Sequence, residues 1–224
     1  MQRWELLGTA SVPGDGAMFR LMRRGDEFVI MAGTNPLMNS RLSGSEEALA
    51  SLSWARIAGR RNPHVLIGGL GMGFTLRAAL AIMPQAVRIS VAELVPEVIE
   101  WARGPLAPLF DGCLDDHRVT VRLDDVGRVI ATGKLAYDAI LLDVDNGPEG
   151  LSRDANDSLY SRAGLAASRV ALRPGGVLAI WSSHPDDGFT KRLADAGLRA
   201  EAIRVRARRG GRGARHTIWL ASRN

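Results

Sequence analysis

The sequence predicts an α/β fold built on a seven-stranded, mostly parallel sheet with helices on both faces. Short apolar runs alternate with helical segments from residue 53 onward, and a glycine cluster joins the first run to a helix. Strands that are apolar on both faces are typical of a buried parallel sheet. Two strand-like runs near the C-terminus flank a glycine-rich turn, which predicts an antiparallel hairpin that closes the sheet.

Seven strands and five helices are expected in this part of the chain. The strands are expected at residues 65–68, 88–93, 119–123, 139–143, 177–182, 200–206 and 216–221. The helices are expected at residues 75–83, 96–103, 126–132, 159–172 and 189–196, the fourth closed by the Arg-Pro-Gly-Gly turn at 173–176. This order predicts a Rossmann-like domain whose hairpin ending resembles that of class I methyltransferases.

The first 52 residues are expected to form a small N-terminal β element, and residues 53–224 the Rossmann-like domain. Residues 18–23 and 27–31, joined by a short Arg-Gly-Asp turn, predict a hairpin. An irregular segment rich in Gly, Asn, Pro and Ser is expected at 33–45, and a helix at 46–58.

The composition is that of an ordinary globular protein. The 224 residues are 46% hydrophobic and 24% charged, which allows one large core. The one cysteine, Cys113, excludes an internal disulfide, and without a Cys/His cluster no metal site is expected. The N-terminus lacks the apolar core of a signal peptide and no run reaches membrane-spanning length, so we expect a cytoplasmic protein.

The glycine cluster is the most informative segment. Gly68, Gly69, Gly71 and Gly73 let the backbone turn sharply and approach a ligand at the start of a helix. Glu93 ends the next strand, where a carboxylate would accept hydrogen bonds from two ribose hydroxyls. Together they predict a nucleoside-binding site.

Acids follow the other strands as well. Asp124 and Asp125 follow the third strand, and Asp143 and Asp145 follow the fourth. Carboxyl ends of parallel strands meet at one edge of the sheet, so we expect these acids around one ligand, with Asp125 on the adenine amine. The alternatives are that Asp124 and Asp125 cap a helix and that Asp145 lies in a simple turn. A nicotinamide cofactor is a competitor, but the hairpin ending and Asp125 favour an adenosylmethionine-type nucleoside.

Several segments, in the same order, resemble the spermidine synthase family. They are the strand and glycine turn at 65–73, the segment at 92–100, the strand at 118–125, the Tyr-Asp-rich strand at 137–143, and the later helix and turn up to residue 178. The resemblance implies that Glu93 binds ribose, that the acid at Asp125 binds adenine and that Asp143 is catalytic. The family transfers an aminopropyl group from decarboxylated adenosylmethionine to putrescine, and its small N-terminal β element commonly helps to form a homodimer.

The departures from this family shift the expected reaction. Leu70 stands where the glycine turn of the family carries an aspartate, and Leu49 and Ala50 stand where its Tyr-His pair would fall. A turn without the aspartate resembles the methyltransferase version, in which backbone amides receive the carboxylate of intact adenosylmethionine. We therefore expect methyl transfer first. Divergent aminopropyl transfer and a non-catalytic nucleoside- or nucleic-acid-binding relative are the alternatives.

Asp143 is the expected catalytic residue, because it would orient an acceptor amine or take its proton. Asp145 is a second candidate, and His184 with Asp186 a third, against which stands a surface position for the histidine. Trp181, Trp219 and Tyr160 are expected in the core.

The segment 204–215 carries six arginines and no acid. It is expected to be a solvated loop on the cofactor side of the sheet. A basic loop there would favour a small anionic acceptor, while a nucleic-acid contact is the less favoured alternative.

Overall fold

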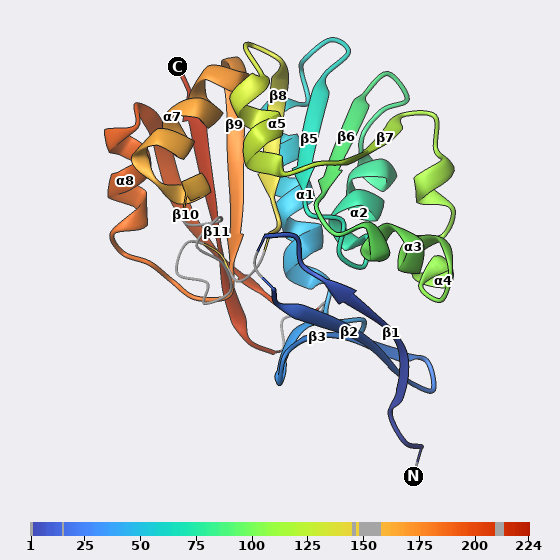
Figure 1. The fold of residues 1–224 in the computed structure, drawn as a ribbon. Helices are drawn as coiled ribbons and strands as arrows, with labels where there is room; N and C mark the ends of the chain where they lie inside the picture. The colour runs from blue at the N-terminus through green and yellow to red at the C-terminus, as the bar shows by residue number, and fades with distance from the viewer. Residues whose placement is uncertain (1, 15, 145–146, 148–157, 209–212) are drawn as a thin grey trace.

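The computed structural model describes residues 2–14, 16–144, 147, 158–208 and 213–224. The larger sheet consists of β5 (His64–Gly68), β6 (Arg88–Glu93), β7 (Val119–Leu123), β8 (Tyr137–Leu142), β9 (Leu172–Ser182), β10 (Leu198–Arg206) and β11 (Arg215–Arg223). Their spatial order is β10-β11-β9-β8-β5-β6-β7 (Figure 1). Strands β5 to β9 pair in parallel, and β11 is antiparallel to both β9 and β10. The predicted fold class is confirmed.

Helices cover both faces of this sheet, as the pattern of apolar strands predicts. One face carries α1 (Gly44–Ile57), α2 (Phe74–Ile82) and α3 (Pro96–Arg103), and the other carries α5 (Val126–Thr132), α7 (Arg162–Ala171) and α8 (Phe189–Asp195). Successive residues of β5 point to opposite faces, so that Val65 and Ile67 join the first core and Leu66 joins the second. Buried side chains on both faces make β5 a central strand.

The N-terminal element is larger than predicted. It is a four-stranded antiparallel sheet made of β1 (Glu5–Ser11), β2 (Met18–Arg24), β3 (Glu27–Ala32) and β4 (Asn35–Asn39). The expected hairpin is β2–β3, but β1 was missed and β4 occupies part of the segment expected to be irregular. Pro36 is compatible with β4 because that strand lies at the edge of the small sheet, next to a register shift.

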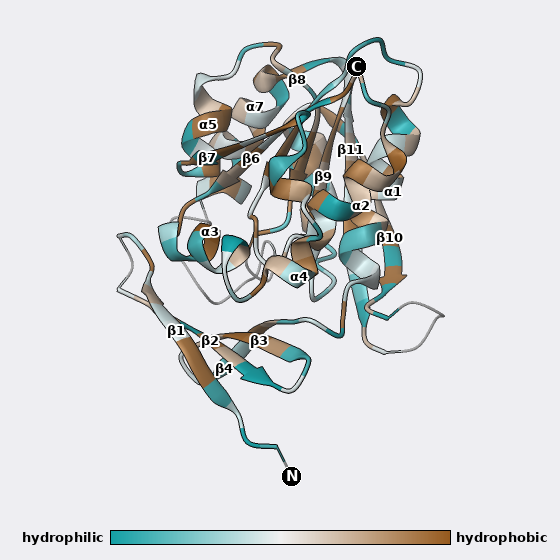
Figure 2. Cartoon of the chain, turned by 90° about the vertical axis from the view of Figure 1, so that its right-hand side faces the viewer, coloured by the Kyte–Doolittle hydropathy of each residue, from teal (hydrophilic) through white to brown (hydrophobic). Residues whose placement is uncertain are grey.

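The small sheet lies across the carboxyl ends of the large sheet (Figures 1 and 2). Ala10, Leu21 and Ile30 from three of its strands belong to the same core as α1, α2 and α3. A Cβ at Gly8 would lie 2.6 Å from the indole nitrogen of Trp101 on α3. Glycine at this position therefore lets β1 pack closely on the larger domain.

Helix α1 runs through the expected boundary between residues 52 and 53. It packs against α2 and against β9. Its first turn, which follows β4 closely in the chain, reaches the space between the two sheets.

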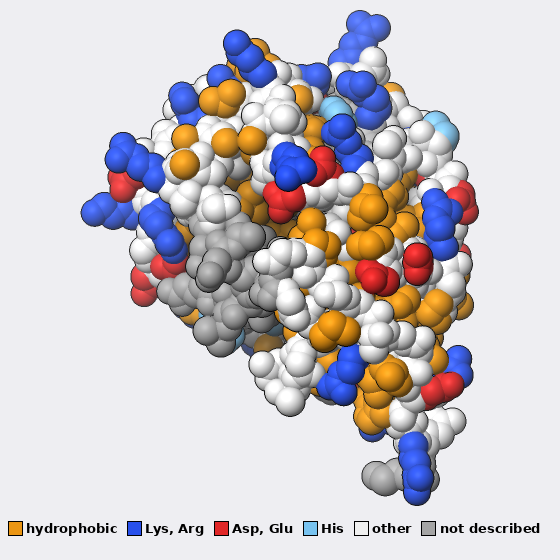
Figure 3. Space-filling view, viewed as in Figure 1, with side chains coloured by type: hydrophobic (Ala, Val, Ile, Leu, Met, Phe, Trp, Pro, Cys, Tyr) orange, Lys and Arg blue, Asp and Glu red, His pale blue; other side chains and the backbone are white. Residues whose placement is uncertain are grey.

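Smaller differences concern the helical connections. A short helix α4 (Ala107–Phe110) and a single 3-10 turn (Cys113–Asp115) follow α3, where the sequence gave no periodic signal. The turn expected at residues 173–176 is the start of β9, and Gly175 has φ of +68° there. Lys and Arg side chains are scattered around the periphery of the face in Figure 3. No helix in the described ranges has the length and apolar character needed to cross a membrane.

Candidate active site

The glycine turn joins β5 to α2, as expected from the sequence. Gly69 and Gly73 have φ values of +88° and +77°, a region that side chains rarely adopt. A Cβ at Gly69 would lie 2.5 Å from the carbonyl oxygen of Asp143, and one at Gly73 would lie 2.6 Å from the ring of Phe110. The turn therefore needs glycine both for its backbone angles and for close packing.

The backbone N–H groups of this turn bind within the protein. The N–H of Leu70 donates to Oε2 of Glu93 at 2.9 Å, and the N–H of Met72 donates to the sulfur of Met38 at 3.1 Å. The N–H groups of Gly69 and Gly73 donate to backbone carbonyls at 2.9 and 2.8 Å. The expectation that these amides receive the carboxylate of a bound nucleoside is therefore wrong for this turn, because the protein itself supplies their acceptors.

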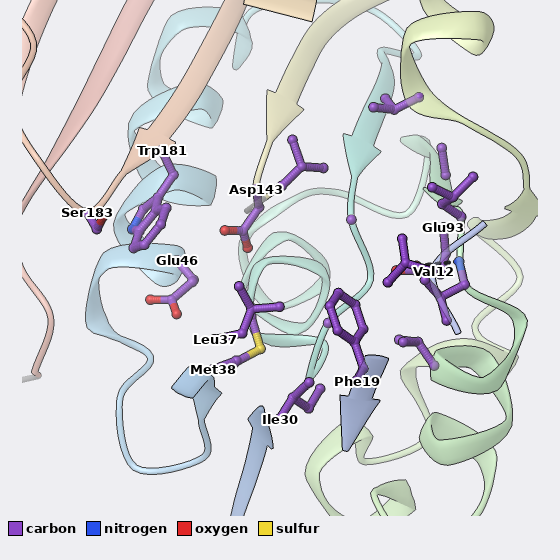
Figure 4. Close-up of a pocket in the computed structure, with 18 of the residues that line it drawn as sticks. Val12, Phe19, Ile30, Leu37, Met38, Glu46, Glu93, Asp143, Trp181 and Ser183 are labelled. Carbon is purple, nitrogen blue, oxygen red and sulfur yellow. Dashed lines mark hydrogen bonds between the residues drawn. The ribbon is translucent and has the colours of Figure 1, made fainter. Parts of the chain in front are cut away.

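Glu93 ends β6 and has an 8% exposed side chain. Its second oxygen accepts the N–H of Val95 at 2.9 Å. Burial raises the pKa of Glu93, and the backbone amides of Val95, Leu70, Leu94 and Gly71 act in the opposite direction. Glu93 thus holds the turn in place, while its carboxylate lines the cavity described below (Figure 4).

Asp124 and Asp125 also line this cavity, and both take part in capping. Oδ1 of Asp125 accepts the N–H of Arg128 at 2.9 Å and caps α5. Oδ1 of Asp124 accepts the N–H of Asp125 at 2.9 Å. The alternative expected from the sequence, helix capping, is therefore present, and it leaves both carboxylates at the cavity wall.

Asp143 follows β8 at the centre of the sheet. The hydroxyl of Thr75, on α2, donates to its Oδ2 at 2.7 Å. Burial raises the pKa of Asp143 to about 6, although the bond from Thr75 lowers it. A carboxyl group that titrates near neutral pH is suited to accepting a proton from an amine.

The sequence analysis missed Glu46, in the first turn of α1. Its side chain is 7% exposed, and Ser45 donates to its Oε2 at 2.6 Å. Burial first, and then the charge of Asp143, raise the pKa of Glu46 to about 7. The only sequence signal is a pair of acids at a helix start, a pattern that favours helix stability and does not indicate a ligand site.

These residues surround one cavity of about 430 Å³ between the two sheets (Figure 4). Its acidic wall contains Glu46, Glu93, Asp124, Asp125 and Asp143, together with Gly69 and Gly71 of the glycine turn. Phe19, Ile30, Leu37 and Met38 of the small sheet form an apolar wall. None of the described residues that line the cavity is a lysine or an arginine.

Gly68 and Gly73 are not among the lining residues of this cavity. A Cβ at Gly68 would lie 2.8 Å from the side chain of Val126. Both glycines therefore allow close packing around the turn. Gly69 and Gly71 are the two that face the cavity.

The other sequence candidates are distributed as follows. Asp145 lies outside the described residues. His184 is exposed, in agreement with its expected surface position, and Asp186 accepts the N–H groups of Gly188 and Phe189 at the start of α8. Trp181 is 9% exposed and lines the cavity, whereas Trp219 and Tyr160 are in the core.

The arginine-rich turn lies on the predicted side of the sheet. Because β10 and β9 are both antiparallel to β11, β10 ends at the same edge as β9. The N–H of Gly44 donates to the carbonyl of Ala207 at 3.0 Å, which joins this turn to the start of α1. Arg204, Arg206, Arg208 and Arg215 are exposed, and Arg209 and Arg212 lie outside the described residues.

Residues 45–186 match the family model described as the spermine/spermidine synthase domain. The chain belongs to this family. It is 35% identical over 122 residues to the polyamine aminopropyltransferase of Nitrosomonas europaea, covering 54% of this chain and 36% of that protein. The corresponding enzyme of Bacillus subtilis is 31% identical over 125 residues, covering 55% and 43%.

The matched region spans less than half the length of these curated relatives. The spermidine synthase structure from Thermotoga maritima has a TM-score of 0.76 and 20% identity, covering 98% of this chain and 73% of that one. At this identity, the likeness shows the shared fold. The family resemblance expected from the sequence is thus confirmed, including the match at the β8 strand that ends beside Asp143.

Proposed function

We propose that this protein transfers an aminopropyl group from decarboxylated adenosylmethionine to an amine acceptor in the cavity between its two sheets. Glu93 would bind the ribose, and Asp124 and Asp125 would face the adenine. Asp143 would receive the acceptor amine. Gly69 and Gly71 would let the backbone approach the nucleoside.

The observation that carries this proposal is the charge of the cavity. Five acids and no described lysine or arginine line it, and a buried ammonium group requires such carboxylate partners. This lining favours a cationic acceptor over the anionic one expected from the arginine-rich turn. That turn is exposed and lies beyond the lining residues, apart from His216 of β11.

The glycine turn favours the decarboxylated donor. Its N–H groups already bind Glu93, Met38 and backbone carbonyls, so an amino-acid carboxylate would find neither these donors nor a basic side chain from the described lining. The aspartate that the family carries in this turn is Leu70, which is buried in the core at 5% exposure. Glu46 provides a carboxylate from another element, α1.

The chemistry is an in-line displacement. One proton leaves the acceptor ammonium for the carboxylate of Asp143, and the free amine nitrogen then bonds to the propyl carbon of the donor. The bond from that carbon to the sulfonium sulfur breaks, and its electron pair stays on the sulfur of the thioether nucleoside. Positioning of the two ligands supplies much of the rate.

The family match and the names of the curated relatives support this reading over methyl transfer, which the sequence alone had placed first. Methyl transfer therefore becomes the second candidate. A non-catalytic nucleoside-binding role is the third.

Calorimetry and product analysis test the proposal. We expect decarboxylated adenosylmethionine to bind at least about tenfold more tightly than the intact form, because one unpaired carboxylate costs on the order of 1–3 kcal/mol. Methylthioadenosine should form when a diamine is present and should not form with an anionic acceptor. A preference for the intact donor, with adenosylhomocysteine as product, would establish methyl transfer. Binding without either product would support the non-catalytic role.

A further inference from the structure

Glu46 is joined to a histidine from the far end of the chain. Oγ of Ser45 lies 2.6 Å from Oε2 of Glu46 and 2.9 Å from Nδ1 of His216. Ser45 is fully buried in α1, whereas His216, on β11, is half-buried. Three ionisable or hydroxylated side chains thus form a continuous hydrogen-bonded chain that leads away from the cavity.

The direction of this chain follows from the number of protons. A serine hydroxyl has one proton to donate, and Ser45 gives it to Glu46. Nδ1 of His216 must then carry a proton and donate it to Oγ of Ser45. The chain is therefore directed from His216 through Ser45 to an ionised Glu46.

The proposed transfer needs an exit for protons. An acceptor amine enters as an ammonium ion and must lose one proton for each group it receives, while Asp143 is buried beneath the ligands. Glu46 lines the same cavity and senses the charge of Asp143. The other charged groups that act on the chain are Glu47, on Glu46, and the exposed His184, on His216.

We propose that Glu46, Ser45 and His216 form a proton path from the cavity to the surface. The inference rests on the proposed function. When Glu46 carries the proton, its O–H donates to Ser45, and Ser45 donates its own proton to Nδ1 of His216 in the Nε2–H tautomer. The imidazolium then releases its Nε2 proton to solvent, which restores the Nδ1–H form and the direction seen in the structure.

Chemical rescue separates this role from a structural link between α1 and β11. We expect His216→Ala to lower kcat about tenfold, with donor affinity unchanged, and free imidazole to restore kcat in proportion to its concentration. Ser45→Ala should lose a similar factor, and Ser45→Thr, which keeps the hydroxyl, should retain most of the activity. A kcat for His216→Ala that imidazole does not change would overturn the proposal.

A titration that needs no turnover tests the path independently. In the nuclear magnetic resonance spectrum of the full chain, we expect Glu46→Gln to lower the pKa of His216, because the imidazolium loses a coupled carboxylate. The matched control is Glu47→Gln, which removes the neighbouring charge outside the chain and should change this pKa less. Equal pKa values of His216 in wild type and Glu46→Gln would refute the coupling. If the protein transfers no aminopropyl group, the proposed function fails, while this titration still decides whether the residues are linked.

Discussion

Glu46 on α1 and Asp143 after β8 face one cavity, and the charge of Asp143 raises the pKa of Glu46. The two residues are 97 positions apart in the chain. Two buried carboxyl groups at this distance from solvent favour a state in which at least one is protonated. A cationic ligand would relieve this constraint, since it would allow both groups to ionise.

Replacing Glu46 by Gln should increase stability at alkaline pH. Because the pKa of Glu46 is raised from 4.5 to about 7 in the folded state, the folded protein binds this proton more tightly than the unfolded chain does. The wild type should therefore lose stability as the pH rises from about 4.5 to 7. We expect Glu46→Gln to have a Tm at pH 8 about 2–4 °C above that of wild type, with a smaller gain at pH 5. Thermal unfolding across this range checks it, and a gain independent of pH would contradict the assignment.

Replacing Asp143 by Asn should abolish transfer and spare donor binding. The amide oxygen of Asn can still accept the hydroxyl proton of Thr75, so the local packing should remain. The loss of a group that takes a proton lowers kcat by about 10²- to 10⁴-fold. Product formation and calorimetric donor affinity, measured on the same preparation, check the two parts separately. Unchanged turnover would show that another carboxylate accepts the proton.

Alanine at Gly69 should destabilise the fold more than alanine at Gly71. At Gly69 the new Cβ would lie 2.5 Å from the backbone oxygen of Asp143, which is fixed at the end of β8. At Gly71 it would meet the mobile end of the Met38 side chain at 2.8 Å, with φ of +49°. We expect losses of about 3 kcal/mol or more for Gly69→Ala and about 1–2 kcal/mol for Gly71→Ala. Urea unfolding measures both, and equal losses would show that the turn adapts at either position.

Restoring the acid of the family at Leu70 should fail. Leu70 packs in the apolar core and is not among the residues that line the cavity. Leu70→Asp would bury a carboxyl group without a partner, at a cost of roughly 3 kcal/mol or more, and it should not improve donor affinity. Leu70→Met is the control, because it keeps the apolar volume. Tighter donor binding by Leu70→Asp would mean that the turn can rotate this side chain into the cavity.

Much of the larger domain could be predicted from the sequence because its signals are local. The apolar runs of β5 to β9 require burial on both faces, and glycines at 69 and 73 require the backbone angles that they adopt. The position of acids at strand ends then follows from the parallel sheet. β1 and β4 were missed because their burial is partial and depends on packing against α3 and the cavity wall.

The acidic pair and the proton path could not be read from the chain in this way. Glu46 is one of two adjacent acids at a helix start, and neither composition nor spacing separates it from the more exposed Glu47. Its contact with Ser45 and His216 joins α1 to β11 across 171 positions. Periodicity and local turn chemistry predict the elements of this fold, because they depend on neighbours in the chain. Which carboxylates share one dry cavity depends on long-range packing of α1 and the small sheet against the strand ends, and it is this packing that raises the pKa of Glu46 and Asp143.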